Sequence, residues 1–178
     1  MALTVVPLPY GLRDVKIAPL APITDVVGTF VDLPNSQTFT FAENEEFQEL
    51  RGDDKVVATH GSGPTVNWTL AAGGISIDAY KILAGGAVTD TGTTPNQLRT
   101  YKKLGANARP YFQVKGQVIS DSGGDLHCIV YKCKAEGEIG GEFADGAFFI
   151  TGASGRGIPD GTDNLYDFLQ HETAVAIP

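Results

Sequence analysis

Ser154 is the residue whose neighbours come nearest to supporting covalent chemistry. It lies in Gly152-Ala-Ser-Gly-Arg156, which approaches the Gly-x-Ser-x-Gly elbow that exposes a nucleophilic serine in some hydrolases. Arg156 occupies the position of the last glycine, and the elbow also requires a following helix on a parallel sheet, which this region does not predict. Because short motifs often match by chance, we interpret Ser154 as a loop serine.

Two histidines are further candidates for chemistry. His60 begins His60-Gly-Ser-Gly, which lacks the lysine and the following helix of a phosphate-binding loop and predicts a turn. His127 lies on an apolar strand face without an acid or cysteine placed to orient it, so a satisfied core histidine is favoured over a base or a ligand. The sequence therefore predicts no catalytic set, no metal site and no cofactor, and we expect the chain not to be an enzyme.

The two cysteines, Cys128 and Cys133, lie five residues apart in one predicted strand. Residues an odd number apart point to opposite faces of a regular strand, and five residues of extended chain span roughly 16 Å. A disulfide needs Cα atoms within about 7 Å of each other. We therefore predict two reduced thiols.

Residues 43–55 carry the densest charge in the sequence. They lack the inner glycine and flanking helices of a calcium-binding EF-hand. One interpretation is a solvated charged loop; the other is a subunit contact, because apolar side chains stand among mixed charges. The candidate contact residues here are Glu45, Glu46, Phe47, Glu49, Leu50, Arg51, Asp53, Asp54 and Lys55.

Residues 1–24 are apolar and rich in proline, and they sustain no helical or strand period. We expect an extended N-terminal arm that packs against another molecule, with Leu8, Tyr10 and Leu12 as candidate contacts. The segment is broken by Pro7 and Pro9 and has no basic start, so it does not predict a signal peptide. No apolar run is long enough to predict a membrane span.

The remaining elements are predominantly β. The 178 residues include 22 glycines and 10 prolines, which indicates many turns, and the net charge of −8 disfavours sequence-independent binding of phosphates. We expect one domain over residues 25–178, an antiparallel β-sandwich or open barrel with one short helix. Expected elements are strands at 36–42, 55–60 and 65–70, a helix at 77–83, a loop at 89–96, a hairpin of 111–119 with 126–135, and a tail at 163–173 that fits a strand or a short helix.

In their order these segments resemble the tail-tube protein family of siphovirus-type phages, which is related in fold to the tubes of contractile tails and of type VI secretion. The resemblance runs from about Val26 to Ala135. It is carried by the proline-rich arm, the strand at 36–42 that enters the charged Glu-Leu-Arg-Gly-Asp-Asp stretch, the Trp68 strand, the single helix and the long hairpin.

The resemblance implies a structural protein of the virion that is made and assembled in the host cytoplasm. Six copies would form a ring whose long strands close a barrel around a channel, and rings would stack into a tube through which DNA passes without specific binding. Tape-measure, distal-tail and tail-terminator proteins are the implied partners. The alternative is a monomeric β-sandwich binding module, for example for carbohydrate, which explains the strand pattern equally well but the apolar arm less well.

Overall fold

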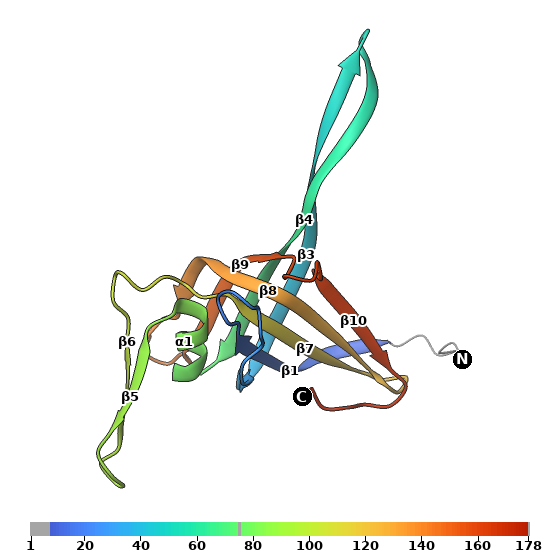
Figure 1. Cartoon of the computed structure of the whole chain (residues 1–178). Helices are drawn as coiled ribbons and strands as arrows, with labels where there is room; N and C mark the ends of the chain where they lie inside the picture. The colour runs from blue at the N-terminus through green and yellow to red at the C-terminus, as the bar shows by residue number, and fades with distance from the viewer. Residues whose placement is uncertain (1–7, 75, 178) are drawn as a thin grey trace.

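The computed structural model describes residues 8–74 and 76–177, and it is mainly antiparallel β-structure with one helix (Figure 1). The predicted fold class is therefore confirmed. The elements are β1 (Pro9–Pro19), β2 (Val31–Asp32), β3 (Ser36–Gly52), β4 (Lys55–Gly73), α1 (Ile77–Ala84), β5 (Ala87–Thr91), β6 (Leu98–Lys102), β7 (Phe112–Ser120), β8 (Asp125–Gly140), β9 (Ile150–Ile158) and β10 (Tyr166–His171).

The main sheet folds over itself through β8 (Figure 1). Its strand order is β2-β1-β7-β8-β9-β4-β3, and β10 also pairs with β8. Residues 125–130 of β8 pair with both β7 and β10, whereas residues 132–140 pair with β9. One layer is thus β2, β1, β7 and β10, and the other is β9, β4 and β3, with β8 contributing to both.

The core lies between these two layers. Val66, Trp68 and Leu70 of β4 are buried on one face, as their alternation predicts. The Trp68 ring meets the Phe112 ring of β7 edge-on, with 5.3 Å between the ring centroids. Gly116 of β7 leaves room for the ring of Phe39 on β3, because a Cβ at that glycine would overlap the ring.

The expectation of an N-terminal arm that needs another molecule is wrong for β1. Val15 and Ile17 are completely buried, and β1 pairs with β7 from Pro9 to Pro19. Val15 and Ile17 alternate with Asp14 and Lys16, so the strand period was present within a segment dominated by proline. Residues 1–7 of the expected arm lie outside the described residues.

The helix α1 follows the local signals of the sequence. The Ser76 hydroxyl accepts a hydrogen bond from the backbone N–H of Ala79 at 3.3 Å, and Gly85 ends the helix with a positive φ of 74°. Within the segment expected to be a loop, residues 92–96 do form a connection, which joins β5 to β6, whereas residues 89–91 belong to β5. Over residues 8–74 and 76–177, no helix combines the length and apolar character needed to span a bilayer.

The cysteines are unpaired, but the prediction that they face opposite sides of the strand is wrong. Cys128 and Cys133 belong to the same buried core cluster. A register shift places Val130 opposite Val114 but Cys133 opposite Phe112, so one extra residue of β8 reverses the alternation. Burial raises the pKa of Cys128 to about 12 and that of Cys133 well above its ordinary value, so both thiols stay protonated and unreactive.

The glycine-rich segment around Ser154 is a strand, which corrects its interpretation as a loop. It forms β9, which pairs with β4 on one side and β8 on the other. A Cβ on Gly155 would overlap the carbonyl oxygen of Lys134, so the glycine allows the close approach of two backbones. Ser154 therefore lies within a sheet and not at the sharp strand-to-helix turn that a nucleophile elbow requires.

The C-terminal tail resolves as a strand, β10, and one side-chain contact fixes it to β8. The Tyr131 hydroxyl donates a hydrogen bond to the Asp167 carboxylate at 2.5 Å. This bond to the carboxylate, with burial and the charge of Asp167, raises the pKa of Tyr131 to about 12 from an ordinary value of 10.0.

We expect Tyr131 to make the folded state sensitive to alkali between pH 10 and pH 12. The pKa of Tyr131 is higher in the folded than in the unfolded chain. Its contribution to the free energy of unfolding is therefore complete below pH 10 and is lost as the pH rises through 12. Urea unfolding at several pH values should show a smaller alkaline loss of stability in Tyr131→Phe than in the parent. Equal losses of stability in both proteins would show that ionisation of Tyr131 does not cause the alkaline sensitivity.

Candidate assembly interface

The long hairpin of β3 and β4 extends well beyond the sheet that supports it. The two strands pair from Ser36 and Ala72 to Gly52 and Lys55, but β4 pairs with β9 only over residues 66–73. We call residues 43–52 of β3 and 55–65 of β4 the distal ribbon, because neither half pairs with a third strand among the described residues. Its nine residue steps extend about 30 Å at the rise of a β-strand, and Figure 1 shows it standing away from the body.

The distal ribbon corrects two expectations of the sequence. Residues 43–55 are paired strands joined by a tight turn, not a charged loop, and Asp53 and Asp54 both adopt positive φ (50° and 62°) as a two-residue hairpin turn requires. The expected turn at residues 61–64 lies within β4. The glycines there accompany a register shift opposite Glu45, with Gly63 at a φ of 44°.

Apolar side chains on the distal ribbon are open to solvent. Phe47 and Leu50 are each 64% exposed, and Val56 and Val57 are exposed on the opposite strand. An isolated two-stranded hairpin is only marginally stable in water, and this one buries none of these residues in its own core. The ribbon therefore presents apolar surface that a partner could cover.

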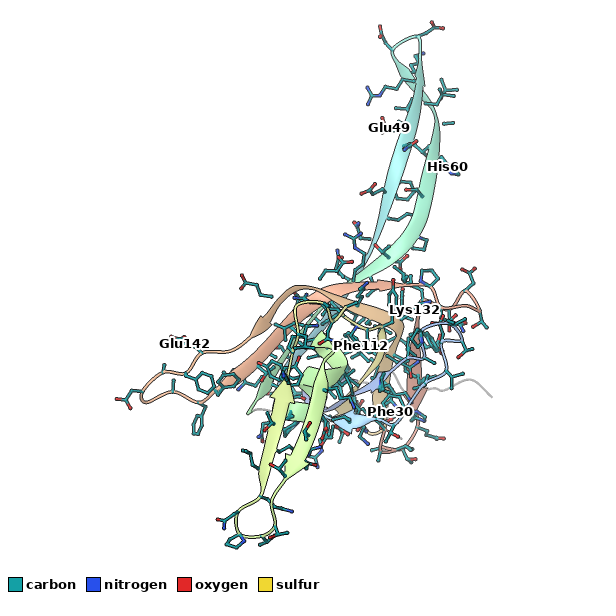
Figure 2. All side chains as sticks on the ribbon, turned by 60° about the vertical axis from the view of Figure 1, so that its left-hand side comes forward. Phe30, Glu49, His60, Phe112, Lys132 and Glu142 are labelled. Carbon is teal, nitrogen blue, oxygen red and sulfur yellow. The ribbon has the colours of Figure 1, made fainter. Side chains whose placement is uncertain are left out.

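The charge of the ribbon is strongly one-sided. Residues 43–60 contain six carboxylates and only two cationic side chains. Their net charge is therefore half of the −8 carried by the whole chain. Arg51 forms an ion pair with Glu49 at 2.8 Å, but both side chains are exposed, so the pair contributes little to stability. Figure 2 shows Glu49 and His60 on the ribbon, far from the core residue Phe112.

The three candidate contacts near the N-terminus separate into two kinds. Leu8 and Tyr10 are 65% and 80% exposed, whereas Leu12 is half-buried and packs partly against the core of its own chain. The backbone N–H of Leu8 donates a hydrogen bond to the Ser120 hydroxyl at 2.8 Å. In Figure 1 the start of β1 and the ribbon leave the body in different directions, so the structure does not join these two sets of residues.

A further apolar surface was missed from the sequence. Phe143 and Phe148, in the connection between β8 and β9, are 86% and 95% exposed. The Phe143 ring lies 4.7 Å from that of Phe149. These aromatic residues stand in a segment rich in glycine and acid, and that contrast was the available signal.

Strand β3, with 17 residues, and strand β10, with six, each have a free edge. Within the described residues, β3 pairs only with β4, and β10 pairs only with β8. Side chains bring the two strands near each other: the rings of Phe41 and Phe168 are 5.2 Å apart, and the Tyr166 hydroxyl donates to the Glu43 carboxylate at 2.8 Å. Unpaired edges of this length are surfaces to which another strand can add.

The sequence shows no relationship that would identify the chain. It matches no known protein-family model, and a search of curated proteins finds no significant relative.

Proposed function

We propose that the chain is the structural subunit of a phage tail tube, which polymerises as stacked hexameric rings around a channel for DNA. The observation that carries the proposal is the distal ribbon, which leaves its own sheet and exposes Phe47 and Leu50. A monomeric protein gains nothing from an extended hairpin without a core, whereas a subunit can bury it against a neighbour.

Two different contacts follow from this geometry. The free edges of β3 and β10 support lateral pairing, in which each copy adds strands to the next until a ring closes. The ribbon, about 30 Å long at the rise of a β-strand, supports contact with the ring above or below. Both contacts join two different surfaces of the subunit. The lateral contact closes into a ring, whereas the contact between rings repeats along the tube.

The charge of the chain suits a conduit for DNA. A net charge of −8 repels phosphates, so DNA can slide past without being retained. The implied partners remain those of the resembled family: further copies of the chain, with tape-measure, distal-tail and tail-terminator proteins at the limits of the tube. The virion tail is the proposed location, after assembly in the host cytoplasm.

Sizing of the purified chain over a range of concentrations, paired with negative-stain electron microscopy, tests the proposal. We expect hollow rings or tubes to appear as the concentration rises. A sharp monomer at every concentration would contradict self-assembly and would favour the monomeric binding module. A glycan-binding screen on that monomer would then test the module directly.

A further inference from the structure

Three side chains with metal-ligating atoms meet where β8 begins and β10 ends. Asp125 and His127 are two residues apart on β8 and therefore share a face. His171 of β10 is directly opposite Asp125 in the strand pairing. One ligand atom from each residue lies within 4.8 Å of the other two, and the two imidazole rings are 4.7 Å apart.

Asp125 is a buried carboxylate that its own chain satisfies only in part. It is completely buried, and its Oδ2 accepts hydrogen bonds from the Gln117 side chain at 2.7 Å and the Val175 backbone N–H at 2.8 Å. Its Oδ1 has no partner among the described residues. Both of these hydrogen bonds come from N–H donors, and such donors favour the ionised form of a carboxylate. A buried negative charge with an unused oxygen favours a cation beside it.

His127 is oriented by an acid, which corrects the expectation from sequence. Its Nε2 lies 3.0 Å from Asp125 Oδ2 and 3.0 Å from the Val175 carbonyl oxygen. An ionised carboxylate and a carbonyl both accept hydrogen bonds, so Nε2 carries a proton that it donates. This proton therefore lies between His127 Nε2 and two oxygen atoms that could also bind a metal ion, Asp125 Oδ2 and the Val175 carbonyl oxygen.

We propose that Asp125, His127 and His171 bind a zinc ion in place of this proton. Zinc at its usual bond lengths of about 2.0–2.2 Å separates neighbouring tetrahedral ligands by about 3.3 Å. The two 3.0 Å separations around His127 Nε2 already approach that spacing, and the Val175 carbonyl oxygen takes the fourth position. The proton on His127 Nε2 shifts to Nδ1 as zinc takes the Nε2 lone pair, so the imidazole stays neutral, as a zinc ligand must be.

To complete the zinc site, the His171 side chain must move closer to the other ligands. His171 is only partly buried, on the last residue of a strand with a free edge, so its ring can move toward the other ligands. Gln117 and the Val175 N–H would hold the Asp125 carboxylate in place, as outer-shell donors do in zinc sites. Zinc at this place would tie β8, β10 and the C-terminal segment together, whether or not the chain assembles.

Calorimetric titration of the tag-free, EDTA-treated chain with zinc chloride tests the site. We expect one zinc ion per chain and a raised melting temperature, and we expect His171→Ala to weaken binding at least about 100-fold, beyond the loss typical of an outer-shell partner. His60→Ala is the matched control, because His60 is exposed on the distal ribbon and should not affect binding.

Circular dichroism of each variant separates loss of the site from loss of the fold. If His171→Ala is folded and binds zinc as tightly as the parent, the assignment is wrong. Absence of zinc binding by the folded parent also overturns it. Neither result depends on the tail-tube proposal, since all measurements can be made on the monomer.

Discussion

Replacing both Phe47 and Leu50 with aspartate should abolish assembly while leaving the monomer folded. Each side chain is 64% exposed, so its loss costs the single chain little. At a subunit contact, an apolar anchor contributes about 2 kcal/mol or more, which is roughly 30-fold in affinity for each residue. The two together should raise the concentration needed for assembly by about three orders of magnitude, as measured by sedimentation velocity.

Leu98→Asp is the control for that experiment. Leu98 is 61% exposed on β6, in the hairpin that is separate from the main sheet, so the substitution introduces the same charge at a similarly open apolar position. It should leave the assembly concentration near that of the parent. If the Phe47 and Leu50 double variant assembles as readily as the parent, the distal ribbon is not a subunit contact.

The elements predicted correctly were those that local chemistry determines. The helix carried its cap and its stop in Ser76 and Gly85, and both act as expected. The hairpin of β7 and β8 had regular alternation and a turn rich in glycine and serine. Trp68 alternated with two aliphatic residues, and all three are buried. In each case the information lay in the element itself and in the turn or cap next to it.

The elements that were missed depend on partners far away in the sequence. Nothing near Val15 indicates that β7, about 100 residues later, pairs with it. The glycines of β9 suggested a loop. Gly155 is needed, however, because both the backbone of β8 and the Trp68 ring lie so close to it that a Cβ would overlap them. The bulge that brings Cys133 to the core likewise arises from the pairing of two strands.

The candidate surfaces divide in the same way. Phe47 and Leu50 were identified because apolar residues among charges are visible in one segment, and the structure exposes both. The Asp125 and His127 pair was also visible, since residues two apart on a strand share a face, but its importance was overlooked. His171 could be added only after β10 was paired with β8.

Trp68→Ala should be among the most destabilising single substitutions in the chain. The side chain is 1% exposed and packs on Phe112, and truncating a buried tryptophan costs about 3–5 kcal/mol. Domains of this kind are stable by about 5–15 kcal/mol, so the loss would be a large fraction of the total. Urea unfolding followed by circular dichroism should show it; fluorescence cannot, because this is the only tryptophan.

Trp68→Phe separates the two opposing contributions of this residue. The indole Nε1 is buried without a hydrogen-bond partner among the described residues, a situation that costs about 1–3 kcal/mol. Phenylalanine removes this unsatisfied donor and keeps a ring against Phe112, so we expect less than half of the destabilisation caused by alanine. If both substitutions cost the same, the indole N–H is satisfied in the folded protein, and the buried volume of the whole indole ring accounts for the stability that Trp68 provides.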